Sequence, residues 1–291
     1  MADYDPILLE IMNSLLSAIA EEMGAALGRT AYSPNIKERR DFSCAVFDAA
    51  GDMVAQAAHI PVHLGAMPLS VAAAIARFPR LSDGDIVVLN DPYAGGSHLP
   101  DITMVSPVFA GDDPGHLLGY VASRAHHADV GGIAPGSMPL ATELYQEGLI
   151  IPPVLLQRGG ELDEGVLDLI TRNSRTPGER LGDLSAQLSS QRLGARRLQE
   201  MAARYGRATL AEYMAHLQDY AERAALALLR EMPTGRYEFV DFLDDDGFGA
   251  RDIAIRVAIK PGENELLFDF TGSAAQVRGG LNAVRSVTLS A

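Results

Sequence analysis

A change of hydrophobic pattern near Pro152 and Pro153 constrains the fold of this chain more than any other feature. Before these prolines, short apolar runs typical of buried strands alternate with loops rich in glycine, histidine and aspartate. After them, from Asp163 to Met232, apolar residues recur at helical intervals. This segregation predicts an α+β fold (mixed α/β). The expected regions are a mixed α/β region at residues 1–155, a helical segment at 156–235 and a β region at 236–291 that is incomplete at its C-terminal end.

Individual elements can be placed from periodicity and from the residues that begin or end them. Residues 6–28 carry a helical apolar stripe, with Asp5 as a plausible N-cap and Pro6 at the first helical position. Gly206 interrupts the later helical pattern, and Pro233 ends it. The expected strands are 41–48, 53–57, 85–90, 102–109, 117–125, 251–260 and 265–271, and the other expected helices are 69–78, 181–205 and 209–232.

Charge and cysteine content exclude several classes of protein. The 24 lysines and arginines against 38 aspartates and glutamates give a net charge of 24 − 38 = −14, which argues against nucleic acid and membrane partners. Cys44 is the only cysteine, so an intrachain disulfide and a thiolate metal cluster are excluded. The acidic N-terminal segment is neither a signal peptide nor a spanning helix, so we expect a cytoplasmic protein.

The densest candidate site is the segment NDPYAGGSHLPD, from Asn90 to Asp101. His98 and Asp101 follow a Gly-Gly pair and lie three residues apart, so a bent loop could direct both side chains at one divalent cation. The alternative is a tight turn in which an aspartate caps the backbone and the histidine is solvated. Asn90 and Asp91, at the start of this segment, are expected to line the substrate pocket.

A second candidate is RAHHADVGG, which contains His126, His127 and Asp129. Adjacent residues of an extended segment point to opposite faces, so one imidazole could bind a metal while the other faces substrate or Asp129. A solvated histidine pair at the end of a strand is equally compatible with the pattern.

Three weaker candidates lie elsewhere in the first region. His59 and His63 are four residues apart, but the proline between them argues against a regular helical metal site, and a role in the pocket wall is preferred. Asp41 is either a ligand at the start of a strand or part of a surface charge cluster. Glu147 is either solvated or part of the pocket.

Motifs for phosphate binding and for common hydrolases are absent from the sequence. It contains no G-x4-G-K-[ST] loop, no G-x-G-x-x-G fingerprint, no G-x-S-x-G elbow and no H-E-x-x-H pair. ATP is therefore not expected to bind to this chain through a known motif.

Five blocks occur in an order typical of one family: KERRDFSCAVFD, HIPVHLGAMP, NDPYAGGSHLPD, SRAHHADVGG and QEGLIIPPV. In these blocks the chain resembles the hydantoinase B/oxoprolinase family, which includes B-type subunits of N-methylhydantoinases and related subunits of acetone and acetophenone carboxylases. The resemblance runs from about Pro6 to the last residue. Family members continue beyond the stretch that matches GSAAQVRGGLNAVRSVT, so the resemblance implies a C-terminally truncated chain.

The resemblance implies one divalent metal ion (zinc, manganese or iron) in the region 1–155. The positions that match metal ligands are Asp41, His98 and Asp101, with one imidazole of the histidine pair, for which we prefer His126. The predicted catalytic residues are His127 and Asp129, and the predicted substrate pocket is formed by His59, His63, Asn90, Asp91 and Glu147.

The resemblance also implies a partner and a reaction. An A-type subunit binds ATP and phosphorylates the substrate oxygen, and the B-type subunit completes the opening of a hydantoin, 5-oxoproline or similar lactam at its metal. A hetero-oligomer is therefore expected. The alternatives are a subunit of an ATP-dependent ketone carboxylase and a non-catalytic assembly subunit. A stand-alone metallohydrolase would differ from all of these by turning over without ATP or a partner.

Overall fold

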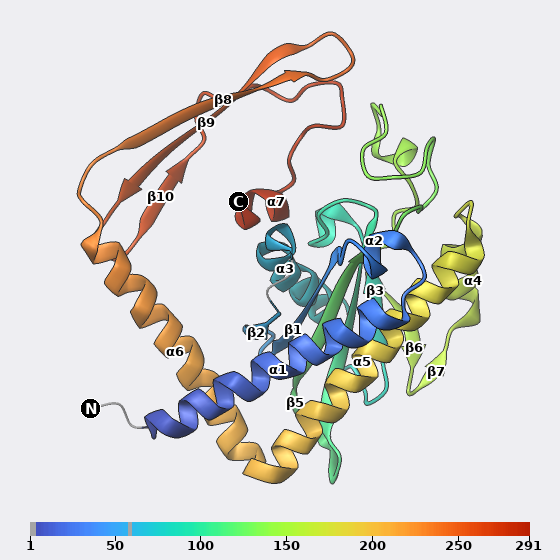
Figure 1. Ribbon diagram of the computed structural model, residues 1–291, viewed down its shortest axis with the longest axis vertical. Coiled ribbons are helices and arrows are strands. Elements are labelled where there is room, and N and C mark those ends of the chain that lie inside the picture. Colours follow the sequence, from blue (N-terminus) through green and yellow to red (C-terminus); the bar gives the residue numbers. More distant parts are fainter. Residues whose placement is uncertain (1–3, 58–59) are drawn as a thin grey trace.

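The computed structural model describes residues 4–57 and 60–291, and its centre is a seven-stranded sheet with the order β2-β1-β5-β4-β3-β6-β7 (Figure 1). Neighbouring strands of this sheet run antiparallel. Helices pack on its two faces, which confirms the predicted α+β fold. The strands are β1 (Phe42–Phe47), β2 (Met53–Gln56), β3 (Ile86–Leu89), β4 (Asp101–Ala110), β5 (Asp113–His126), β6 (Val154–Arg158) and β7 (Glu161–Leu162).

Both faces of the sheet are buried, which explains why its strands have apolar runs instead of a simple alternation. In β5, Val121 belongs to a core shared with α1 (Pro6–Thr30) and α5 (Pro177–Tyr205). The next residue, Ala122, belongs to a second core shared with α3 (Pro61–Arg77) on the other face. Successive side chains therefore serve two different helical layers.

A local cap places the start of α1, and long-range side-chain hydrogen bonds hold α5 against the sheet. The Asp5 carboxylate accepts a hydrogen bond from the backbone amide of Ile7, so the N-cap predicted for α1 is confirmed. Helix α5 is fixed to β4 by a side chain that reaches the sheet backbone, because Gln187 Nε2 donates to the carbonyl of Ile102 at 3.0 Å. Gln191 makes the same kind of bond to the carbonyl of Met104.

Helix α3 starts earlier than predicted. The sequence predicted a helix at 69–78, in an alanine-rich apolar stretch, but α3 begins at Pro61 and continues through Pro68, although a proline inside a helix removes a backbone hydrogen bond. Pro61 occupies the first turn, where no amide donor is needed. The helix buries Met67 and Val71 against the sheet, and this apolar contact offsets the cost of the internal proline. His63 consequently lies on a helix, whereas His59 lies outside the described residues.

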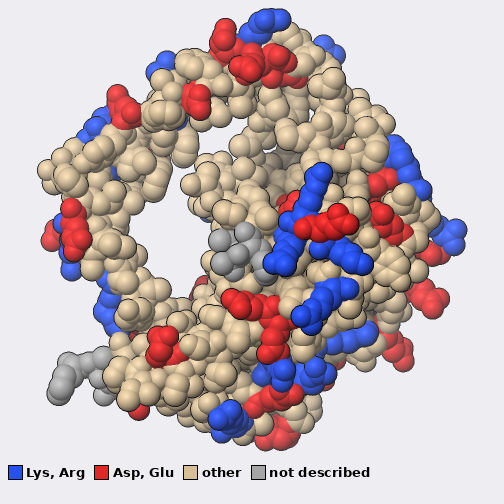
Figure 2. Space-filling model, in the orientation of Figure 1, with Lys and Arg blue, Asp and Glu red and all other residues tan. Residues whose placement is uncertain are grey.

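From Arg207 onward the chain forms an arm, which leaves the body made by the central sheet and its helices and then returns to it. Helix α6 (Arg207–Glu231) leads to a three-stranded sheet with the order β10-β9-β8. The hairpin predicted for its last two strands, β9 and β10, is confirmed. Its first strand, β8, was not predicted. Space-filling Figure 2 shows an opening between this arm and the body. The remaining elements are β8 (Tyr237–Asp245), β9 (Arg251–Pro261), β10 (Leu266–Asp269), α2 (Pro34–Lys37), α4 (Glu164–Arg172), α7 (Arg285–Ser290) and the 3-10 turns η1 (Pro92–Ala94) and η2 (Leu144–Gln146).

The arm closes back on the body through α7, which packs on α3. Gly65 permits this approach, since a Cβ atom there would lie 2.6 Å from the Cα of Ser290. The predicted boundary at residue 155 falls inside β6, a strand of the central sheet. The division of the chain into three regions stays a prediction.

Candidate metal centre

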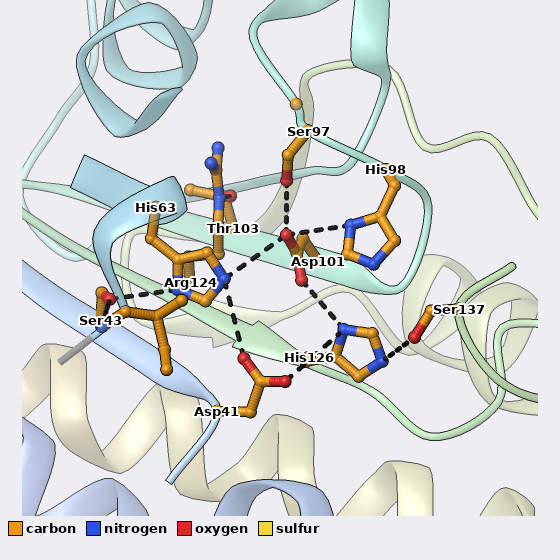
Figure 3. Close-up of polar contacts among 12 residues, drawn as sticks. Asp41, Ser43, His63, Ser97, His98, Asp101, Thr103, Arg124, His126 and Ser137 are labelled. Carbon is orange, nitrogen blue, oxygen red and sulfur yellow. Dashed lines mark hydrogen bonds and ion pairs between the residues drawn. The ribbon is translucent and has the colours of Figure 1, made fainter. Parts of the chain in front are cut away.

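The antiparallel register of three strands gathers residues that are far apart in the sequence (Figure 3). Asp101 begins β4 and pairs with His126 at the end of β5. Asp41 precedes β1 on the other side of β5, and its carbonyl accepts a hydrogen bond from the amide of His126 at 2.9 Å. His98 enters from the loop before β4, and His63 enters from α3. Five candidate side chains thus meet at one end of the sheet.

Asp101 is the centre of the cluster and is fully buried. Its Oδ1 lies 3.2 Å from Nδ1 of His126, and its Oδ2 lies 3.0 Å from Nδ1 of His98 and 3.4 Å from Nε2 of His63. The hydroxyl of Ser97 also donates to Oδ2. Burial alone would raise the pKa of Asp101, but the hydrogen bonds from His126, His63 and His98 outweigh it and hold the pKa well below its usual range.

Asp41 provides the more open side of the cluster, with a side chain that is 32% exposed. Its carboxylate lies 4.0 Å from Nδ1 of His126 and 3.8 Å from Nε2 of His63. The other nitrogen of His63 lies 3.0 Å from the hydroxyl of Ser43, which fixes the ring between β1 and the two carboxylates. The preceding residue, Arg40, has a left-handed φ of 55°, a conformation uncommon for arginine that marks a constrained backbone beside Asp41.

The donor set suits a divalent cation. His98, Asp101 and His126 each offer one ligand atom, and these atoms lie within 4.8 Å of one another. Imidazole nitrogen with carboxylate oxygen is a ligand set for zinc, manganese or iron. Nε2 of His126 lies 3.0 Å from the hydroxyl of Ser137, so a proton on Nε2 can be donated there while Nδ1 remains free as a ligand. Asp101 also acts on the pKa of His98. Burial alone would lower this pKa, but the hydrogen bond to Asp101 and the negative charge of Asp101 raise it above the ordinary value.

A Gly-Gly pair gives the loop that carries His98 its close path over the body. Gly95 has a φ of 90°, and a Cβ atom there would lie 2.4 Å from the carbonyl carbon of Leu69. A Cβ atom on Gly96 would lie 2.2 Å from the carbonyl oxygen of Asn90. Both positions therefore require glycine, as the tight backbone path inferred from the sequence implies.

The two predicted pocket residues at the start of this loop make backbone contacts. The side-chain Nδ2 of Asn90 donates to the backbone carbonyls of Leu99 and Leu149, and its Oδ1 accepts from the backbone amide of Ile151. Asp91 caps η1 by accepting a hydrogen bond from the amide of Tyr93. In the described contacts, both residues shape the loop that presents His98.

The remaining predicted residues, His127, Asp129 and Glu147, lie around the cluster and are not part of it. His127 points to the opposite face from His126: its Nε2 lies 2.9 Å from Oε1 of Gln187, and burial lowers the pKa of the ring to about 4. Asp129 accepts hydrogen bonds from the backbone and side chain of Arg175. Glu147 is partly buried, which raises its pKa, and it is close enough to His98 for the charge of that ring to oppose the rise.

Sequence reasoning did not select the hydroxyls of Ser43, Ser97 and Ser137. Serine is common in loops, so its presence beside a histidine carries little information until the backbone path is known. Their proximity to the candidate ligand side chains depends on tertiary structure alone.

Comparison with known proteins identifies the family and the fold of this chain. The family model for hydantoinase B/oxoprolinase matches residues 5–291. The 5-oxoprolinase of Saccharomyces cerevisiae is 39% identical over 305 residues, covering 99% of this chain and 23% of that protein. The crystal structure of an ATP-dependent caprolactamase from Pseudomonas jessenii is 33% identical with a TM-score of 0.91, covering 99% of this chain and 49% of that one. A nucleotide-free acetone carboxylase is 21% identical with a TM-score of 0.90, covering 99% and 40%, which shows a shared fold alone.

The chain spans between 22% and 50% of the length of the first curated relatives that it matches. Among the described residues, no helix combines the length and the apolar character that crossing a membrane requires.

Proposed function

This chain belongs to the hydantoinase B/oxoprolinase family, and from that premise we propose that it is the metal-binding part of an enzyme that opens cyclic amides in an ATP-dependent reaction. The observation that carries the proposal is the cluster of His98, Asp101 and His126 at the end of the central sheet. The names of two similar proteins, 5-oxoprolinase and ATP-dependent caprolactamase, support a lactam as the substrate class.

In the proposed centre, His98, Asp101 and His126 hold one divalent ion, and Asp41 completes the set from the exposed side. Such an ion supplies Lewis acidity toward an amide oxygen and lowers the pKa of water. The chain contributes orientation, because Ser97 holds the Asp101 carboxylate and Ser137 holds the far nitrogen of His126.

Glu147 is the proposed proton-transfer group. It is partly buried near His98, and its raised pKa brings it closer to the range in which a carboxyl group both takes up and releases a proton. The catalytic roles predicted for His127 and Asp129 stay predictions. The hydrogen bonds of these two side chains lead to Gln187 and Arg175 and not to the cluster.

ATP is proposed to act through a partner. The sequence has no phosphate-binding loop, whereas the similar caprolactamase is named as ATP-dependent. We therefore propose a cytoplasmic hetero-oligomer in which an A-type subunit binds ATP and this chain carries the metal centre.

A ketone carboxylase is the second candidate function, and the fold shared with acetone carboxylase favours it. The two activities are distinguished by substrate, since the carboxylase consumes a ketone and bicarbonate while the hydrolase consumes a lactam and water. A non-catalytic assembly subunit is the third candidate and differs in predicting an idle cluster.

The test is the metal content of the purified chain beside an Asp101→Ala variant, with Asp168→Ala as a control on an exposed ion pair. We expect about one equivalent of a transition metal in the wild type and in the control, and a loss of at least about 100-fold in affinity in Asp101→Ala. In the complex with an ATP-binding partner, lactam turnover should fall by a similar factor. Full turnover by Asp101→Ala would reject the catalytic proposal in favour of an assembly role.

A further inference from the structure

Arg124 is a fully buried arginine that the proposed metal chemistry does not use. It lies on β5 two residues before His126, so the two side chains point to the same face of the sheet. The register pairs Arg124 with Thr103 and His126 with Asp101, which places the guanidinium directly behind the cluster (Figure 3).

The guanidinium joins β4, α3 and the Gly95 loop through directed hydrogen bonds. Its Nε donates to the hydroxyl of Thr103 on β4 at 2.8 Å. Its Nη2 donates to the hydroxyl of Ser70 on α3 at 2.7 Å and to the carbonyl of Gly95 at 3.2 Å. The Ser70 hydroxyl in turn donates to the same Gly95 carbonyl at 2.7 Å.

The Gly95 carbonyl is the point from which the ligand loop is held. Two residues further on, Ser97 donates to Asp101, and the next residue, His98, supplies an imidazole to the cluster. We propose that Arg124 is a positioning residue, which fixes the Gly95 carbonyl and so sets the place of Ser97 and His98 against Asp101.

This role accounts for a residue that is costly to keep. A buried guanidinium loses much of its hydration, and among the described residues Nη1 of Arg124 has no hydrogen-bond partner. An apolar side chain of similar length would avoid that cost. The arginine is explained by the three directed hydrogen bonds that an apolar side chain cannot make.

The charge of Arg124 and its positioning role predict opposite changes in the affinity for a divalent cation when the side chain is removed. The inference rests on the proposed metal function. If Arg124 acted only as a positive charge near Asp101, its removal would strengthen the binding of a divalent ion. If it acts by holding the loop, its removal weakens binding although a repulsive charge has been lost. The sign of the change therefore separates the two.

The experiment measures zinc and manganese binding to the full chain by competition with a chromophoric chelator. For Arg124→Met we expect at least about a tenfold loss of affinity, and for Arg124→Lys, which keeps the charge but loses the fork, a smaller loss. Arg172→Met, on an exposed ion pair, is the matched control and should bind as the wild type does. Equal or tighter binding by folded Arg124→Met would overturn the inference.

Two further measurements keep the test decisive. Cobalt(II) absorption bands report ligand geometry directly, and they should change in Arg124→Met and be partly restored in Arg124→Lys, which general destabilisation would not produce. If Arg124→Met does not fold, Ser70→Ala removes the hydroxyl between the guanidinium and Gly95 while retaining the charge, and should weaken binding about threefold. Unchanged binding and spectra in both Ser70→Ala and Arg124→Lys would overturn the inference, whereas a wild type that binds neither metal would overturn the proposed metal function instead.

Discussion

The two sheets of this molecule have similar strands and opposite surroundings. All residues of β4 except Phe109 are buried, between α3 on one face and α5 on the other. Every residue of β8 is exposed, including the large apolar side chains of Phe239, Phe242 and Leu243. Burial in this chain is therefore decided by what covers a strand, and the strand sequence alone does not reveal it.

The exposed sheet nevertheless has an ordered apolar face. The register between β8 and β9 sets Tyr237 opposite Ile259, Phe239 opposite Val257 and Leu243 opposite Ile253. Because side chains alternate along a strand, these residues share one face. Part of this face, including Leu243 and Ile253, lines a cavity of about 970 Å³ between the arm, α7 and the Gly95 loop.

The largest expected contrast between the two sheets is in thiol reactivity. Cys44 on β1 is buried, and burial raises the pKa of its thiol to about 12, so the reactive thiolate is scarce. A Phe239→Cys change in a Cys44→Ala background places a thiol on the exposed sheet. We expect Cys44 to react with a disulfide reagent at least about 1,000-fold more slowly than the cysteine at position 239, since reaction requires the body to open. Similar rates would mean that the body opens as readily as the arm.

A matched pair of isoleucines measures the contrast in stability. Ile102 on β4 is fully buried and Ile255 on β9 is 45% exposed. Ile102→Ala should lower the free energy of unfolding by about 3 kcal/mol, because it removes buried methyl groups and leaves a cavity. Ile255→Ala should cost less than about 1 kcal/mol. The measurement is chemical denaturation of both variants, and equal losses would show that the arm sheet is covered in solution.

The smallest expected contrast is in acid sensitivity. Burial would raise the pKa of Asp129, but hydrogen bonds from the amides of Gly131 and Arg175 and the charge of Arg175 hold it below the ordinary value. The unfolded chain therefore binds the proton more readily, so the stabilisation is present at neutral pH and is lost as pH falls below about 4. Asp129→Asn should cost about 1 kcal/mol at pH 7 and flatten this dependence.

Asp269 on the arm provides the comparison. Its pKa is also lowered, by hydrogen bonds from Thr271, but its side chain is 32% exposed, against 4% for that of Asp129. Asp269→Asn should therefore change the acid transition less than Asp129→Asn does. Thermal unfolding followed from pH 7 to pH 3 checks both variants, and a larger effect at Asp269 would contradict the assignment of acid sensitivity to the body.

Local signals were sufficient for most elements of the fold. Asp5 and Pro6 marked the start of α1, and apolar runs marked the strands from β1 to β5. The start of α3 was misplaced because the alanine-rich stretch marks only the second half of the helix, and burial of the first half against the sheet offsets the cost of Pro68 inside it. Strand β8 was missed because its acidic residues interrupt the pattern, and it is recognised only by its pairing with β9.

In the candidate site, too, local sequence indicated some features and tertiary structure decided the others. The sequence indicated the residue types and the segments, since His98 and Asp101 lie in one loop and the histidine pair ends a strand. Spacing could not choose between His126 and His127, because alternation states only that they point apart. The register pairs His126 with Asp101, whereas the ring of His127 lies against Gln187.

The sequence by itself determined the α+β class, the position of most helices and strands, and the set of imidazole and carboxylate groups available to a cation. These depend on periodicity, caps and turns, which act over a few residues. Only the tertiary structure decided which of those groups meet, that Arg124 holds their loop, and that one sheet is covered while the other is exposed. Contacts between residues as distant as Asp41, Asp101 and His126 follow from strand register and helix packing, and spacing along the chain does not encode them.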